Sequence, residues 1–424
     1  MPALMPARAF RKTLLGLAVA GSLGVAQAQA GDVEVLHWWT SGGEARAANV
    51  LKELMEEEGH HWEDFAVAGG GGETAMTVLK SRAMSGNPPS AAQIKGPEIQ
   101  EWGDLGLLGS LDDVAESEGW DEKLPGVVAD VMKHDGQYVA VPVNVHRVNW
   151  LWANPEVLEE AGVALPTTLD EMFAAGEAIR EAGYVPLAHG GQAWQDATVF
   201  ETVLLATAGN DFYRRTMVDL DPEALGSEQM IEALENFKRM RELMDDDMSG
   251  RDWNIATSMV ISGKAAMQLM GDWAKGEFTA AGLEPGKDYL CVPAPGTEHS
   301  FTFNIDSLAM FRVSEEADQE AQRTLARLVL EPEFQKTFNL AKGSIPARPD
   351  LDMSEFDQCA RKSLEDFQRT ADEGGLVPSM AHGMAVRSDV QGAIFDVVTN
   401  FFNSPDMSAE QAAQRMVSAA QAVM

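Results

Sequence analysis

Aromatic, charged and amide residues end or interrupt apolar runs at three places in the chain. Trp38 and Trp39 end the run VEVLHWW, Lys95 ends SAAQIK, and Asn304 and Asp306 lie two apart in FTFNIDSLAMF. Side chains two apart in an extended segment share one face, so this amide and this carboxylate can bind adjacent hydroxyls together. Tryptophan rings offer flat walls, and lysine is an unusual core residue. These residue types indicate a binding site for a ligand that has both apolar faces and hydroxyls.

Sequence motifs for covalent, phosphate or metal chemistry are missing from the chain. There is no G-x-S-x-G motif, and the adjacent His60 and His61 lack the spacing of a metal pair on a helix. The glycines at 69–72 are not followed by the Lys-Ser/Thr pair of a phosphate loop. We therefore predict no catalytic residues, no metal and no cofactor.

Residues 1–30 have the features of a secretory signal peptide. Arg8, Arg11 and Lys12 precede an apolar stretch that ends in the small-residue sequence AQAQA. The stretch is too short to span a bilayer, and no later segment approaches the roughly 20 apolar residues that a membrane helix needs. We expect the leader to be cleaved and the mature chain to reside in the periplasm.

The chain is strongly acidic, with a formal net charge of -34. The leader contains three basic and no acidic residues, so its removal takes this charge to -37. Such a chain cannot neutralise a row of phosphates, which excludes nucleic acid as a partner.

The chain has two cysteines, Cys291 and Cys359. In an oxidising compartment two cysteines pair more often than not, which favours a disulfide over two buried free thiols. Their spacing does not fit the C-x-x-C pattern of redox or zinc sites.

Predicted strands and helices alternate along the chain, and the length suits two domains. Near the N-terminus we predict strands in 33–39, 64–72 and 90–96 and helices in 45–59, 74–86 and 97–106. This alternation favours a parallel sheet covered on both faces. A crossover strand is expected in 137–147, strands in 264–273 and 301–313, and a long helical region in 317–343.

Eight segments together resemble the solute-binding subunits of bacterial sugar ABC importers, in the glucose- and mannose-binding branch. They are HWWTSGGE, AVAGGGG, QIKGPEIQEWG, VPVNVHRVNWLWANPEVLEEAG, GKAAMQLMGDWAKGEF, SFTFNIDSLAMF, AKGSIPAR and SMAHG. The resemblance implies an α/β fold of the two-lobed periplasmic binding protein type, type II and maltose-binding-protein-like. It also implies three hinge crossings, which we expect near 142–146, 296–303 and 343–347. The lobes would then hold residues 31–142 plus 300–344 and residues 146–298 plus 346–424.

The same resemblance implies a sugar site between the lobes, with Trp38 and Trp39 on one side and Trp273 on the other. For Trp39 or Trp38 the alternative is core packing, because adjacent residues of a strand point in opposite directions. The resemblance also adds polar residues to Lys95, Asn304 and Asp306. These are Glu44, Gln93, Lys342 and His382.

Several of these residues have an ordinary structural alternative. Glu44 can complement the N-terminus of the following helix, and Lys342 can cap a helix C-terminus. His382 can be a hydrogen-bonded core histidine. His146, Arg147, Trp194 and Trp253 are further candidates for the cleft, again with core packing as the alternative.

The resemblance implies a monomeric, non-enzymatic binding protein that delivers a monosaccharide, D-glucose first, to inner-membrane ABC permease subunits. Mannose, galactose, xylose or a short glucoside is the alternative ligand, and a chemoreceptor is a possible second partner. The alternative of another class is an exported glycoside hydrolase, which would need two carboxyl groups flanking one bond.

Overall fold

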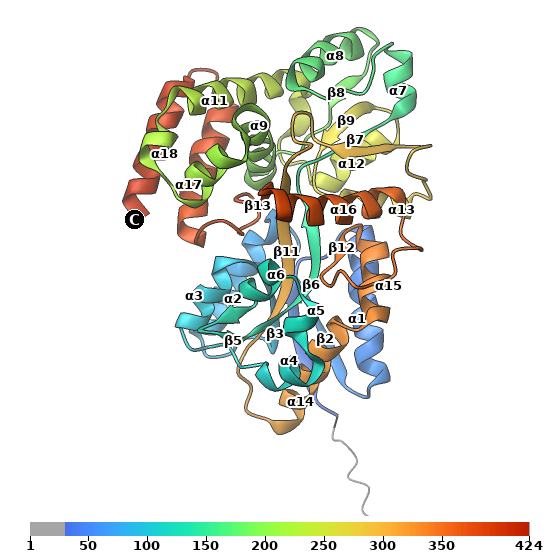
Figure 1. Ribbon diagram of the computed structural model, residues 1–424, viewed down its shortest axis with the longest axis vertical. Coiled ribbons are helices and arrows are strands. Elements are labelled where there is room, and N and C mark those ends of the chain that lie inside the picture. Colours follow the sequence, from blue (N-terminus) through green and yellow to red (C-terminus); the bar gives the residue numbers. More distant parts are fainter. Residues whose placement is uncertain (1–29, 424) are drawn as a thin grey trace, which may run out of the picture.

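The computed structural model describes residues 30–423, so the predicted signal peptide lies outside the described residues except for its last residue. The described chain forms two lobes (Figure 1), each with its own sheet and its own apolar core. The predicted two-lobed α/β fold is therefore confirmed.

The first lobe contains a seven-stranded sheet with the order β12-β6-β11-β3-β1-β2, and β13 pairs with β11 outside this path. The strands are β1 (Asp32–His37), β2 (His61–Ala66), β3 (Ala91–Ile94), β6 (Ala140–Arg147), β11 (Phe301–Met310), β12 (Ile345–Pro346) and β13 (Leu376–Pro378). β1 is parallel to β2 and β3, whereas β11 is antiparallel to β3 and β6. The expectation of a parallel sheet is thus right for the first three strands only, because β11 enters this sheet from the second lobe.

Helices flank this sheet, and the first shows how the sequence sets their limits. Ser41 and Glu44 form a capping box at the start of α1, and Ala47, Leu51 and Met55 are buried along one face. The predicted region 317–343 is two helices, because Pro332 starts a new one. The helices of this lobe are α1 (Gly42–Glu57), α2 (Glu73–Met84), α3 (Pro97–Asp104), α4 (Asp112–Glu118), α5 (Trp120–Lys123), α6 (Gly126–Val131), α14 (Glu316–Val329) and α15 (Pro332–Lys342), with the small hairpin β4 (Lys133–His134) and β5 (Gln137–Tyr138).

The second lobe contains a four-stranded sheet with the order β10-β7-β9-β8. Its strands are β7 (Trp150–Ala153), β8 (Val185–Leu187), β9 (Ala265–Leu269) and β10 (Leu290–Pro293). Its helices are α7 (Pro155–Glu160), α8 (Leu169–Glu181), α9 (Ala193–Tyr213), α10 (Pro222–Leu225), α11 (Glu228–Met240), α12 (Trp253–Ile261), α13 (Ala274–Ala280), α17 (Ser388–Asn403) and α18 (Ala409–Val423). The buried residues of α9, α11, α17 and α18 belong to the same apolar core as those of β7 and β9.

The helix α16 (Gln358–Glu373) crosses the middle of the molecule, between the lobes (Figure 1). A disulfide joins Cys359 in this helix to Cys291 in β10, with a Cα–Cα distance of 6.0 Å. The fully buried guanidinium of Arg147 donates to Asp366 of α16 at 2.6 Å and to the carbonyl of Ser300 at 2.9 Å. Arg147 ends β6 and Ser300 precedes β11, so one ion-paired arginine fastens both connecting segments to α16.

The chain leaves the first sheet after β6 and enters the second at β7, so this crossing occupies residues 148–149. Residues 142–146, where we expected it, are still paired within the first sheet. The return crossing lies between β10 and β11, at 294–300.

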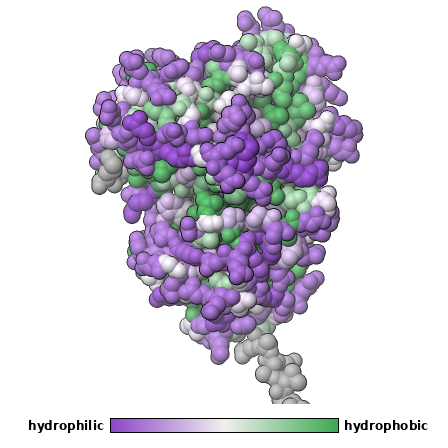
Figure 2. Space-filling view, in the orientation of Figure 1, coloured by the Kyte–Doolittle hydropathy of each residue, from purple (hydrophilic) through white to green (hydrophobic). Residues whose placement is uncertain are grey.

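The face in Figure 2 is mostly hydrophilic, and hydrophobic residues gather near its waist and at one end. Across residues 30–423, no helix combines the length and the apolar character that a membrane span requires.

Candidate functional site

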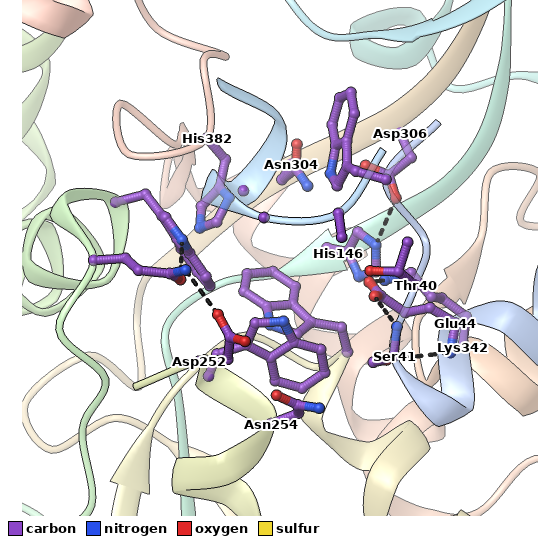
Figure 3. Close-up of a pocket in the computed structure, with 18 of the residues that line it drawn as sticks. Thr40, Ser41, Glu44, His146, Asp252, Asn254, Asn304, Asp306, Lys342 and His382 are labelled. Atoms are coloured by element: carbon purple, nitrogen blue, oxygen red, sulfur yellow. Dashed lines mark hydrogen bonds and ion pairs between the residues drawn. The ribbon is translucent and has the colours of Figure 1, made fainter. Parts of the chain in front are cut away.

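A cavity of about 210 Å³ lies between the lobes and is lined by residues of both (Figure 3). Trp38 and Lys95 follow the carboxyl ends of β1 and β3, which is where ligands of open α/β sheets bind. Eight of the ten residues predicted for the site line this cavity. They are Trp38, Glu44, Lys95, Trp273, Asn304, Asp306, Lys342 and His382.

Trp39 and Gln93, the other two predicted residues, do not line the cavity and lie behind its wall. Trp39 is only 1% exposed, packs edge-on against Phe338, and donates from Nε1 to Asp306 at 3.2 Å. Gln93 is fully buried and accepts from the backbone N–H of Trp38 at 3.2 Å. Both support residues that do face the cavity.

Asn304 and Asp306 face the cavity from β11, opposite β6. Asn304 is opposite His146, and Asp306 is opposite Asn144. The register shifts between Asp306 and Ser307, opposite the proline of β6, which has no N–H for the ladder. The pairing of β11 with β6 continues on both sides of this bulge, and Asp306 is the last residue before it.

Asp306 is the most heavily paired group of the site. Its carboxylate lies 3.3 Å from the Lys95 ammonium and 3.1 Å from Nε2 of His146, and it also accepts from Trp39. Burial alone would raise the pKa of Asp306, but Lys95 and His146 outweigh burial and hold this pKa well below its usual range. Asp306 is therefore a carboxylate at neutral pH.

His146 bridges two carboxylates and is almost fully buried. Its Nδ1 is hydrogen-bonded to Asp272, which also accepts from the backbone N–H of Arg147 at 2.9 Å. Burial favours the neutral ring, but Asp272 and Asp306 outweigh it and raise the pKa of His146. The two carboxylates therefore favour the protonated form of this ring.

Glu44 fills the capping role considered for it, Lys342 lies in the last turn of α15, and both line the cavity. Glu44 accepts from the backbone N–H of Ser41 as part of the α1 capping box, and Lys342 donates to its other oxygen at 2.6 Å. Lys342 also ends α15 and is followed by Gly343 with φ of 96°. Helix capping places this buried ion pair on the cavity wall.

His382 lies among aromatic rings of the second lobe. Its ring centroid is 4.8 Å from that of Trp273 and 5.6 Å from that of Trp194, and its Nε2 is 3.2 Å from Thr198 Oγ1. Burial, reinforced by the cations Lys95 and His146, lowers the pKa of His382 well below its usual range. His382 is therefore neutral, and its imidazole can both donate and accept.

The loop that carries His382 is held by a buried glutamate of α9, Glu201. This carboxyl accepts from Ser379 Oγ at 2.6 Å, from Tyr213 Oη at 2.9 Å and from the backbone N–H of Ala381 at 3.1 Å. Burial raises the pKa of Glu201 to about 7, although these hydrogen bonds oppose the rise.

Trp194 and Trp253, considered above as further candidates, also line the cavity, whereas Arg147 does not. Gln192, Asp252 and Asn254 line it too and were missed. They lie at the starts of helices, in polar segments that show no sequence pattern typical of a binding site. His146, the remaining further candidate, lines the cavity as well.

These groups can bind an uncharged polyol. Aromatic faces come from Trp38 in the first lobe and from Trp194 and Trp273 in the second, and charged or amide groups surround them. The side-chain oxygen of Asn304 is buried and finds no hydrogen-bond partner among the residues the structure describes. A ligand hydroxyl would satisfy this oxygen. Residues 30–423 contain no cluster of His, Cys, Asp and Glu that could hold a metal ion.

Comparison with known proteins gives concordant results. The family model described as Bacterial extracellular solute-binding protein matches residues 38–336. A relative from Rhizobium meliloti, named Probable sugar-binding periplasmic protein, is 48% identical over 97% of this chain and 99% of its own. The Xylose/arabinose-binding protein XacG of Haloferax volcanii is 29% identical over 91% of this chain and 84% of its own. The solved structure of the solute receptor AcbH, described as preferring β-D-galactopyranose, superimposes with a TM-score of 0.78 at 16% identity, covering 93% of this chain and 100% of the receptor.

Proposed function

The chain belongs to the bacterial extracellular solute-binding protein family, and from this premise we propose that it captures a monosaccharide, D-glucose, in the periplasm. The two lobes close on the sugar, and the closed form delivers it to the permease of an ABC importer. Ligand contacts from both lobes would favour the closed state.

The observation that carries this proposal is the composition of the cavity wall. Tryptophans of both lobes supply flat faces for the C–H surfaces of a pyranose ring. Lys95, Asp306 and Asn304 supply charged and amide groups for adjacent hydroxyls. The cavity of about 210 Å³ is a compact chamber, which favours one ring over an extended chain.

The environments of Asp306 and Glu44 weigh against a glycoside hydrolase that uses either of them as its acid. Hydrolysis requires one carboxylic acid that can donate a proton to the leaving group. Asp306 is kept ionised by Lys95 and His146, and Glu44 is ion-paired with Lys342. Neither carboxyl has the environment of a general acid.

Isothermal titration of the mature chain, freed of co-purified ligand by unfolding and refolding, tests the proposal. We expect D-glucose to bind more tightly than mannose, galactose or xylose. Asp306→Ala or Lys95→Ala should weaken binding by about 2 kcal/mol or more, roughly 30-fold, because each removes a charged group that is proposed to hydrogen-bond to the sugar hydroxyls. Asp211→Ala and Lys287→Ala, at exposed positions, are matched controls that should bind as the unmodified chain does.

The same preparation should release no nitrophenol from nitrophenyl glycosides. Turnover of these substrates would favour the hydrolase. Binding of xylose or galactose in place of glucose would keep the binding function and change the ligand.

A further inference from the structure

The chain passes between the lobes once more after β13. This strand pairs with β11 in the first sheet, whereas α17 belongs to the apolar core of the second lobe, so residues 379–387 connect the two lobes. His382, which lines the proposed sugar pocket, lies within this connection. The position of its imidazole therefore depends on what holds a segment that is part of neither sheet.

Glu201 reaches the backbone of His382 through one intervening side chain. Ser379 Oγ donates to Glu201 Oε1 at 2.6 Å and accepts from the N–H of His382 at 3.1 Å. The other oxygen of Glu201 accepts from the N–H of Ala381 at 3.1 Å. Glu201 belongs to α9 of the second lobe, so these contacts fasten the connection to that lobe. Glu201 and Ser379 are fully buried, and water cannot replace their hydrogen bonds.

Tyr213, also in α9, holds the start of the same connection. Its hydroxyl accepts from the N–H of Met380 at 3.0 Å. It also lies 2.9 Å from Glu201 Oε2 and 2.8 Å from the carbonyl oxygen of Pro378, the last residue of β13. Backbone groups of residues 378, 380, 381 and 382 are thus all linked to Glu201 and Tyr213.

The connection also contacts the first lobe beside the pocket. A Cβ built on Gly96, the residue after Lys95, would lie 2.3 Å from the carbonyl oxygen of Gly383. Glu201 itself does not line the cavity, so it cannot touch a sugar there. Any effect of Glu201 on sugar binding must therefore pass through the connection and the residues that it carries.

We propose that Glu201 is a positioning residue for sugar binding, which acts through Ser379 and the connection 379–387 to hold His382 against the ligand. This rests on the sugar-binding function proposed above and assigns part of the affinity to a carboxyl group outside the pocket. The alternative is a purely structural role, in which Glu201 stabilises the fold and His382 keeps its place without it. The two roles differ in what Glu201 does for affinity once His382 is removed.

A double-mutant cycle measured by titration calorimetry separates these roles. The probe is D-glucose or, where mannose, galactose or xylose binds more tightly, that sugar, used up to millimolar concentration so that weakened binding stays measurable. Glu201→Leu should weaken binding about tenfold, because the connection loses its buried acceptor. In the His382→Ala background, Glu201→Leu should change the affinity by less than about twofold.

The conservative variant Glu201→Gln should bind within about twofold of the unmodified chain, because an amide can keep contacts with both Ser379 and Ala381. Ser379→Ala breaks the same link from the side of the connection and leaves the fold of α9 untouched, so it tests the proposal even where the leucine variant does not fold. It should weaken binding about threefold, again only where His382 is present. Glu232→Leu, at an exposed position of α11, is the matched control and should bind normally.

Unchanged sugar affinity in Glu201→Leu and Ser379→Ala would overturn the positioning role and leave the proposed function intact. A loss of the same size with and without His382 would overturn it as well, since the effect would not pass through that residue. Absence of heat with every sugar would instead overturn the proposed function, and the positioning role with it.

Discussion

Glu201, which holds the loop of His382, should make the stability of the protein depend on pH. In the unfolded chain this carboxyl loses its proton near its ordinary pKa of 4.5, whereas in the folded protein burial raises the pKa to about 7. Between these values the folded state binds one more proton than the unfolded state. The free energy of unfolding must therefore fall as the pH rises through this window.

The size of the effect follows from the two pKa values. Each unit of pKa difference corresponds to about 1.4 kcal/mol, so a rise from 4.5 to about 7 costs about 3 kcal/mol of stability once the pH is above 7. Glu201→Gln removes this cost. The amide can accept from Tyr213 and Ala381 through its oxygen and donate to Ser379 through its nitrogen, as the protonated acid would.

Urea unfolding of the ligand-free chain at pH 5 and pH 8 measures the effect. The quantity compared is the change in the free energy of unfolding between the two pH values, in Glu201→Gln and in the unmodified protein. Relative to the unmodified protein, Glu201→Gln should gain about 2 to 3 kcal/mol between these two pH values. The same change at exposed Glu232 should leave the pH dependence of the unmodified protein in place. Parallel stability curves for the unmodified protein and Glu201→Gln would refute the reasoning.

Three further predictions concern the connections around the site. Replacing both Cys291 and Cys359 by serine should lower the free energy of unfolding by about 4 kcal/mol, since the bond closes a loop with a sequence separation of 68. Urea unfolding of the oxidised chain is the reference, and an unchanged midpoint would contradict the prediction. Trp39→Phe should lower sugar affinity about tenfold although the ring does not face the cavity, because Asp306 loses a hydrogen bond to a charged group. Calorimetry measures this, and an unaltered affinity would show that the bond is dispensable. Glu101 accepts from the N–H and hydroxyl of the first residue of α17 at 2.9 and 2.8 Å, across the two lobes. Glu101→Gln should speed sugar release about fivefold by weakening a carboxylate's contact with a helix N-terminus. Stopped-flow tryptophan fluorescence would record this, and an equal release rate would argue that the contact does not hold the lobes together.

The sequence was informative about the site wherever a side chain follows the end of a strand. Lys95 could be assigned because a lysine at the end of an apolar run has no place in a core. It was less informative about which of two neighbours faces the cavity. Trp38 and Trp39 are chemically identical, and their different positions depend on long-range contacts with Phe338 and Asp306.

The same distinction applies to the fold. The break at Pro332 was present in the sequence as a local signal and divides the predicted long helix. The sequence contained no local signal for the antiparallel direction of β11. This direction depends on pairing with strands about 160 and 210 residues away in the chain. Polar loop residues such as Gln192 were missed because no local pattern separates them from other loops.

The buried part of the pocket is electrically self-contained. Its three basic groups, Lys95, His146 and Lys342, are paired with the three carboxyl groups of Glu44, Asp272 and Asp306. An uncharged sugar entering this balanced set displaces no counterions, so its occupancy should hardly respond to ionic strength. The surface behaves differently, because the chain has a net charge of -34. Salt weakens its electrostatic interactions with any charged partner, with a screening length of about 8 Å at physiological ionic strength. Ionic strength should therefore change the association of the sugar-bound protein with charged partners while leaving its affinity for the sugar nearly unchanged.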